Sequence, residues 1–308
     1  MEKILHYNLD KHLGDGKYGE YYLAWDGGLD RIILVEFLGP ALALDDSFRD
    51  RFDNDMKKLA DIDHEHIAGF YALQEGEGRL FVLREYVEGR TVKELIAESE
   101  FSYALFLGYA IQMTAGIKAA HEALILHRNI ASQNIIVSDK KKVKLVNFGL
   151  PGKIDHIGLD EPPGAYDYYL APEQTRNQFE SPETDLYSLG MVFYEMLARD
   201  LPFKGATRRE LFRSIQNDAP DFSTGPAAQI PPDGRLLIEK LLSKDGSDRF
   251  RDADELLITL QAMLDYHFNR SEISERHAKH KSPRTYLLLS VLVILIIIFW
   301  LVISTVYR

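Results

Sequence analysis

The chain has 308 residues, of which 46% are hydrophobic and 27% charged, so it can bury one large core or two smaller ones and is not a disordered segment. Its formal net charge of -11 disfavours a nucleic-acid partner, because binding phosphates requires clustered Lys and Arg side chains. It contains no cysteine, which excludes disulfides, thiolate metal ligands and a cysteine nucleophile.

The first third of the chain is predicted to be rich in β-strands. Residues up to about Asp30 have the glycine-punctuated pattern of a β-hairpin. A helix is expected over residues 46–62, where Phe52, Met56 and Leu59 recur at spacings of three and four. Further strands are predicted at residues 31–39, 67–73 and 79–87.

Beyond Thr91 the apolar residues recur mainly with a helical period. Helices are predicted at residues 91–100, 104–124, 185–200, 208–215, 234–243 and 253–268. A β-rich part followed by a larger helical part indicates an α+β protein with two lobes.

The C-terminal segment has the composition of a membrane anchor. Residues 285–307 contain no charged side chain, and about 20 apolar helical residues cross a bilayer core. Residues 269–284 form a polar linker with five basic side chains, whereas only Arg308 follows the apolar run. The positive-inside rule therefore predicts a single-pass, tail-anchored protein whose N-terminal part is cytoplasmic. The N-terminus lacks the apolar region of a signal peptide.

Several short motifs follow one another in a fixed order. Gly14, Gly16 and Gly19 have the spacing G-x-G-x-x-G between two predicted strands, a pattern that is weak by itself but lets a hairpin close over phosphates. The later motifs are HRN…N at 127–134, NFG at 147–149, APE at 171–173, DLYSLG at 185–190 and LPF at 201–203.

Together these motifs identify a family resemblance. Residues from about Tyr7 to about His267 resemble a serine/threonine protein kinase domain. The segments APEQ and YSLGMVFYEML are similar to those of bacterial members of that family. The resemblance implies a bilobal kinase-like fold, with a kinase-like domain at residues 1–268, a juxtamembrane linker at 269–284 and a transmembrane helix at 285–307.

The sequence departs from the family pattern where the chemistry takes place. By the resemblance, Glu36 replaces the strand lysine that binds phosphates, and its helix partner aligns with Asp55. Asn129 replaces the base aspartate, Ala131 the catalytic-loop lysine, and Asn147 the metal-binding aspartate. Because several catalytic roles are missing together, we expect a pseudokinase that is not an enzyme.

A vestigial nucleotide site remains possible at Gly14, Gly16, Gly19 and Asn134, and Lys17 could substitute for the missing lysine. Asn134 alone is a poor magnesium ligand, since this cation prefers carboxylates. We therefore expect no metal site and no cofactor, with ATP binding doubtful. The histidines of DIDHEH at 61–66 lack a zinc-binding pattern.

Three larger side chains are predicted to fill the cleft. Tyr21 and Leu34 align with the smaller residues that contact adenine in the family, and Arg84 aligns with the apolar residue before the hinge. We hypothesise that Arg84 pairs with Glu36, Asp55 or both. The alternative is that Arg84 reaches solvent and Glu36 points outward.

Other family positions with structural roles are retained. By the resemblance, His127 and Phe148 belong to an internal hydrophobic column, Asp185 anchors the catalytic loop, and Glu173 and Arg249 hold the helical lobe. The segment 150–173 contains no Ser or Thr, so it has no Ser/Thr acceptor for activating phosphorylation.

The expected function is therefore that of a membrane-tethered scaffold or regulator in a signalling complex. Its expected partners are the lipid bilayer, through one helix, and proteins such as an active kinase, a substrate or a membrane complex. A bacterial inner membrane is the expected location. An ATP-binding switch without hydrolysis and an unorthodox ATP-dependent transferase remain alternatives.

Overall fold

A computed structural model describes residues 2–15, 19–43, 46–98, 101–148 and 158–280. The chain divides into two compact units, Met1–Gln261 and Ala262–Arg308. The first unit contains every described strand and helix except the later part of the last helix, α9 (Ala253–His280), which continues into the second unit.

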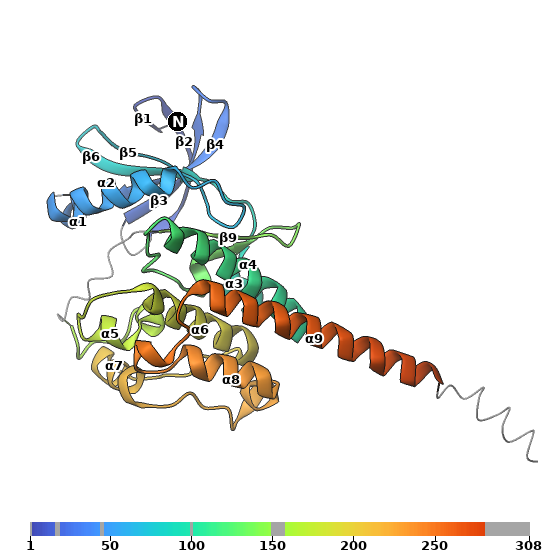
Figure 1. The fold of residues 1–308 in the computed structure, drawn as a ribbon. Helices are drawn as coiled ribbons and strands as arrows, with labels where there is room; N and C mark the ends of the chain where they lie inside the picture. Colours follow the sequence, from blue (N-terminus) through green and yellow to red (C-terminus); the bar gives the residue numbers. More distant parts are fainter. Residues whose placement is uncertain (1, 16–18, 44–45, 99–100, 149–157, 281–308) are drawn as a thin grey trace, which may run out of the picture. The chain divides into compact units, whose positions relative to one another are not determined.

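The N-terminal part of the first unit is a six-stranded antiparallel sheet, in the order β1-β2-β3-β4-β6-β5 (Figure 1). Its strands are β1 (Glu2–Ile4), β2 (Tyr7–Asp15), β3 (Gly19–Asp26), β4 (Arg31–Leu38), β5 (Phe70–Gly76) and β6 (Arg79–Glu85). The pairs Tyr21↔Glu36 and Leu34↔Arg84 lie in register, so β3, β4 and β6 place Glu36 and Arg84 on neighbouring strands.

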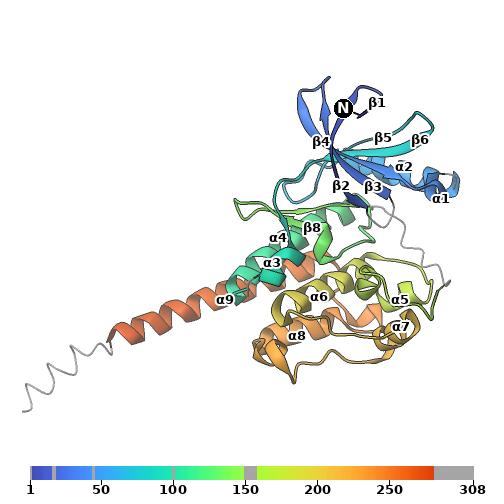
Figure 2. The ribbon, with the colours of Figure 1, turned by 180° about the vertical axis from the view of Figure 1, so that it is seen from behind.

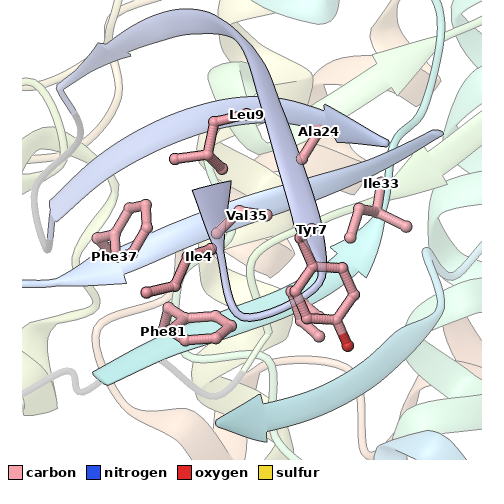
Figure 3. Close-up of a cluster of buried hydrophobic side chains, with 9 residues drawn as sticks. Ile4, Tyr7, Leu9, Ala24, Ile33, Val35, Phe37 and Phe81 are labelled. Carbon is pink, nitrogen blue, oxygen red and sulfur yellow. The ribbon is translucent and has the colours of Figure 1, made fainter. Parts of the chain in front are cut away.

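One face of this sheet encloses an apolar core. Because side chains alternate along a strand, Val35 and Phe37 of β4 point the same way and meet Phe81 of β6 (Figure 3). The full cluster comprises Ile4, Tyr7, Leu9, Ala24, Ile33, Val35, Phe37, Phe81 and Leu83. Burying each large apolar side chain contributes about 1.5–3 kcal/mol, so the cluster fixes the register of the strands.

Two helices, α1 (Pro40–Ala43) and α2 (Asp46–Ala60), follow β4. Helix α2 packs against β5, where the rings of Phe52 and Phe70 meet edge to face with centroids 6.4 Å apart. Phe52, Met56 and Leu59 are buried, as their helical spacing predicts. Because this face of α2 is fixed against the sheet, the position of Asp55, which precedes Met56 on α2, is fixed as well.

The C-terminal part of the first unit is helical, and α6 (Pro182–Ala198) is its central helix, in contact with α4 and α8. In the view from behind, α3 and α4 are drawn above α6, on the side of the N-terminal sheet (Figure 2). The other helices are α3 (Val92–Glu98), α4 (Tyr103–Glu122), α5 (Pro172–Thr175), α7 (Arg208–Asn217) and α8 (Pro232–Leu241). Short 3-10 turns lie at Ser132–Asn134, Asp167–Tyr169, Gly225–Gln229 and Gly246–Asp248.

A small three-stranded sheet supports the loops between these elements. It consists of β7 (Arg90–Thr91), β8 (Ile135–Val137) and β9 (Val143–Leu145), in that order. The backbone amide of Leu145 donates to His66 O at 2.9 Å, and that of Ala68 donates to Leu145 O at 2.9 Å. The small sheet is thereby joined to the segment that follows α2, and it positions the loops on either side of β8 and β9.

The predicted combination of a β-rich lobe and a helical lobe is confirmed. The strand predicted at 67–73 instead runs over Phe70–Gly76, because residues 67 and 68 pair with the small sheet. The predicted transmembrane helix at 285–307 lies outside the described residues. Within the described part of the chain, no helix has the length and apolar character needed to cross a membrane.

Candidate functional site

The segment His127–Asn134 is held in place by a buried carboxylate of α6. Asp185 accepts hydrogen bonds from the backbone amides of His127 at 2.8 Å and Arg128 at 2.9 Å. His121 Nε2 lies 2.8 Å from the same carboxylate. Burial alone would raise the pKa of Asp185, but these partners lower it below its usual value. The predicted anchoring contact between Asp185 and this loop is therefore present.

His127 and Phe148 pack together below the loop. Their rings are tilted by 31° with centroids 4.1 Å apart, and both side chains are buried. Burial lowers the pKa of His127 to about 4, because the apolar surroundings disfavour the imidazolium. His127 is consequently neutral at pH 7, which fits the predicted packing role.

Three asparagines form a chain of hydrogen bonds on the loop. Asn134 Nδ2 donates to the backbone carbonyl of Asn129 at 2.7 Å, and Asn147 Nδ2 donates to Asn134 Oδ1 at 2.9 Å. The carbonyl of Asn129 can only accept, so it fixes the orientation of the Asn134 amide and, in turn, that of Asn147. Ala131 is buried, and its side chain carries no polar atom.

This amide chain affects what the loop can hold. The Asn134 oxygen, which could otherwise bind a cation, is already engaged by Asn147. None of the three side chains carries a charge, whereas magnesium is usually held by carboxylates. In the described part of the chain, no group of three or more His, Asp or Glu side chains is placed to bind a metal ion.

Arg84 and Glu36 form a buried ion pair. Arg84 Nη2 lies 3.2 Å from Glu36 Oε2, with 5% and 0% of the two side chains exposed. Tyr21 Oη donates to the other carboxylate oxygen at 2.7 Å. Burial and the negative charge of Glu36 raise the pKa of Tyr21 far above its usual value, so its hydroxyl keeps its proton. We call Tyr21, Glu36 and Arg84 the cleft network.

The cleft network settles which acid of the sequence hypothesis pairs with Arg84. Arg84 does contact Glu36, and Glu36 points inward. Of the two acids proposed as partners of Arg84, Glu36 is the one in contact, whereas Asp55 Oδ2 lies 2.6 Å from Arg128 Nη1. A second acid near Glu36 would repel it, whereas the guanidinium of Arg128 attracts the carboxylate of Asp55.

Arg128 is a junction between three segments. Its guanidinium binds Asp55 of α2 and, through Nε at 3.1 Å, Glu180 in the loop before α6. Burial lowers the pKa of Arg128, but Asp55 and Glu180 outweigh that effect and raise it. Sequence reasoning overlooked Arg128 and Glu180. The only indication in the sequence was that Asp55 needed a new cationic partner, because Glu36 replaces the strand lysine that the resemblance pairs with it.

Two of the glycines are required by the backbone. Gly14 has φ of +133°, a conformation that L side chains rarely adopt. A Cβ atom on Gly19 would lie 1.6 Å from the carbonyl oxygen of Phe37. The backbone geometry of β2 and β3 therefore explains why glycine is needed at both positions, without any reference to a ligand. Gly16 and Lys17 lie outside the described residues. Leu34 is partly buried on β4.

Glu173 and Arg249 form a bidentate ion pair in the helical lobe. The guanidinium nitrogens of Arg249 lie 2.7 and 2.9 Å from the two carboxylate oxygens, and Thr184 donates to Glu173 Oε1 at 2.8 Å. Despite the burial of Glu173, the contact with Arg249 lowers its pKa. The pair joins α5 to the segment before α9, as the resemblance implies.

Tyr169, which precedes α5, has a packing role. Tyr169 is buried, and its hydroxyl donates to Glu195 at 2.6 Å and lies 2.8 Å from Ser132 Oγ. This contact ties the loop at Ser132 to α6 and was not foreseen. Of the segment 150–173 discussed above, residues 150–157 lie outside the described part of the chain.

The comparisons with known proteins agree on one family. The profile described as "Protein kinase domain" matches residues 7–259. The chain is 27% identical over 263 residues to the serine/threonine-protein kinase PrkC of Bacillus subtilis. It is 30% identical over 273 residues to a probable serine/threonine-protein kinase of Streptomyces coelicolor. Each match covers 84% of this chain but only 40% of the relative.

Solved structures show the same fold. The crystal structure of the Mycobacterium tuberculosis PknI kinase domain matches with a TM-score of 0.67 at 22% sequence identity. The match covers 85% of this chain and 97% of that one. At this identity the likeness concerns the fold.

These comparisons contradict the expectation that the chain is not an enzyme. The relatives that match most of the chain are named serine/threonine kinases, which points to an enzyme. That expectation rested on side-chain types at five aligned positions, and it read the retained Asp185 and His127 as structural residues only. With a profile match over residues 7–259 and a bilobal structure of the same fold, the chain belongs to the protein kinase family.

Proposed function

We propose that this kinase-family protein is a membrane-tethered regulator that acts mainly by binding a partner protein in a signalling complex. The observation that supports the proposal is the cleft network, in which the carboxylate of Glu36 is ion-paired with Arg84 and accepts a hydrogen bond from Tyr21. The partner is a protein such as an active kinase, its substrate or a membrane complex.

The cleft network supports weak nucleotide binding. Glu36 stands where the family places a cation for the phosphates, so its carboxylate repels them until Arg84 neutralises it. Because Arg84 is committed to Glu36, the described part of the cleft offers no uncompensated arginine or lysine to a nucleotide from β4 or β6. We therefore propose that ATP is not a tightly held cofactor.

The retained architecture supports a binding role. The contacts of Asp185, the Glu173–Arg249 pair and the Arg128 junction together keep the loops of the helical lobe in fixed positions. A rigid surface loses little conformational entropy when a partner binds. These contacts consequently favour a protein that presents a fixed kinase shape.

The tether is proposed from the sequence. Residues 285–307 have the length and composition of a single membrane span, with residues 1–268 on the cytoplasmic side of a bacterial inner membrane. Each basic residue of the linker near the surface adds about 1 kcal/mol of attraction to anionic lipid. Confinement to the bilayer raises the effective concentration of a membrane partner. The acidic net charge of -11 argues against a nucleic-acid partner.

A second candidate is phosphoryl transfer by an unorthodox arrangement of residues. It is favoured by the relatives, which are named kinases. This reaction would need a cation near the phosphates, and the intact Asn134 and Asn147 pair would have to open to bind a metal ion.

A nucleotide titration of the full chain in detergent separates the two candidates. A ligand at about 100 times its dissociation constant raises the free energy of unfolding by about 2.7 kcal/mol, which a thermal shift detects easily. The proposal predicts no such shift with ATP, with or without magnesium. The double variant Glu36→Lys/Arg84→Leu is the matched control, because it places a cation on β4 and removes its competitor.

Transfer is measured in parallel with ATP labelled at the α- or γ-phosphate. A metal-dependent thermal shift of the wild type, together with transfer of the γ-label, would refute the regulator and establish the second candidate. An absent shift in the wild type and its appearance in the double variant would support the regulator.

A further inference from the structure

The loop between α5 and α6 displays a bare aromatic side chain. Phe179 is 100% exposed, the largest exposed fraction of any large apolar side chain in the described part of the chain. The loop itself is well held, since Gln178 N donates to Glu173 O at 2.9 Å and Ser181 N donates to Thr184 Oγ1 at 3.1 Å. Phe179 is therefore presented from a fixed backbone, and large aromatic side chains supply much of the energy of protein interfaces.

A hollow of about 440 Å³ lies beside this phenylalanine. Its lining residues are Glu173, Arg176, Gln178, Phe179, Ser181, Lys244, Asp245 and Gly246. Exposed phenylalanine beside arginine is a combination enriched at protein interfaces. We call these residues the Phe179 surface.

The hydrogen bonds around the Phe179 surface leave more donors than acceptors. Both oxygens of Glu173 are taken by Arg249, and both oxygens of Glu180 are taken by Gln174 and Arg128. Asp245 accepts from the backbone amide and hydroxyl of Ser247 through one oxygen.

Two cations line the same hollow. Arg176 is exposed and lines the hollow. Lys244 also lines the hollow, and its ammonium group donates to the carbonyl of Ile215 at 2.6 Å and lies 3.8 Å from the centroid of the Phe203 ring. Against these cations stands one partly bonded acid, Asp245, so the hollow favours an occupant that brings carboxylates.

From this combination we propose that the Phe179 surface is the docking site for the partner protein, and that it receives a segment with acidic side chains next to an apolar one. This inference rests on the proposed regulator role and names the surface that the role uses. The apolar residue covers Phe179 and the carboxylates face Arg176 and Lys244. Glu180 follows Phe179 directly and binds Arg128, so docking occurs one residue away from the junction with α2.

The test begins with a phage-displayed random peptide library, selected on the full chain in detergent and counter-selected on Phe179→Ala. The surviving peptides are expected to combine Asp or Glu with an apolar residue. Synthetic copies are then titrated by calorimetry. Phe179→Ala is expected to weaken binding by about tenfold or more, as an aromatic anchor does. Arg176→Glu is expected to weaken it as well, and added salt should lower the affinity.

The matched control is Leu236→Ala, which removes an exposed apolar side chain from α8, outside the Phe179 surface. Its affinity for the peptides should equal that of the wild type. Phe179 is solvent-exposed, so its removal should leave the melting temperature unchanged, which separates lost docking from lost folding.

Two results would overturn the proposal: no peptide survives the counter-selection, or the survivors are basic or neutral and bind Arg176→Glu as well as the wild type. The regulator role has its own test in the ATP titration. A wild type without an ATP shift but with no acidic peptide at Phe179 would leave the regulator standing and reject this surface.

Discussion

Removal of Arg84 is expected to leave the buried carboxylate of Glu36 without its cation. In Arg84→Ala, Glu36 keeps only the hydroxyl of Tyr21 as a partner, while its side chain is 0% exposed. Breaking a buried ion pair from one side typically costs about 3–5 kcal/mol. In a domain of this size each kcal/mol lowers the melting temperature by about 2–4 °C, so a fall of roughly 10 °C is expected.

A double-mutant cycle in thermal and denaturant unfolding tests the cause. Replacing both partners, as in Arg84→Met/Glu36→Leu, removes the unpaired charge and should recover most of the stability lost in Arg84→Ala. The matched surface control is Arg209→Ala, whose ion pair with Asp160 at 3.0 Å is largely exposed, and its melting temperature should equal that of the wild type. An unchanged melting temperature in Arg84→Ala would show that the pair is not buried in solution, and the argument for a closed cleft would fail.

Three further outcomes follow from the same contacts. Tyr21→Phe removes a hydrogen bond to the buried Glu36 carboxylate and should lower the free energy of unfolding by about 1.5–3 kcal/mol in urea titrations, with a smaller loss when Glu36 is also Gln. The pKa of His127 is lowered to about 4 in the folded protein, whereas that of an unfolded histidine is about 6.5. The contribution of His127 to the free energy of unfolding is therefore complete above about pH 6.5 and falls as the pH drops from there towards 4. His127→Phe should flatten that part of a curve of stability against pH, and an unchanged slope would contradict the low pKa. Arg249→Lys keeps the charge but loses the two-pronged contact with Glu173, so its melting temperature should fall, whereas an unaltered value would mean that the charge alone suffices.

Much of the fold was accessible from the sequence because local patterns and tertiary packing agree. The spacing of Phe52, Met56 and Leu59 predicted the buried face of α2, and the β-branched run at 31–39 predicted β4. The strand at 67–73 was misplaced by three residues at its start. Residues 67 and 68 look equally apolar, but their backbone pairs with Leu145, a contact that no local pattern encodes.

The one ion pair of the site that the sequence predicted is that between Arg84 and Glu36. Arg84 was expected to pair with an acid because a buried charge without a partner is strongly disfavoured, and its partner Glu36 lies on the adjacent strand, two residues along β4 from Leu34. The partner of Asp55 was missed because Arg128 lies 73 residues further along the chain, on a loop. The expectation that the chain is not an enzyme was wrong for a different reason. A substitution at an aligned position shows which side chain has changed, but it does not measure whether the reaction still takes place.

The Arg128 junction has a consequence for how this chain can vary. Its guanidinium compensates Asp55 and Glu180 at once, and its backbone, with φ of +61°, is fixed by Asp185. A change at Arg128 alone would leave two acids facing each other, whereas a change at either acid leaves the other bond intact. In a set of close homologues, Asp55 and Glu180 should therefore tolerate independent substitution, while Arg128 should be replaced only where both acids have already been lost.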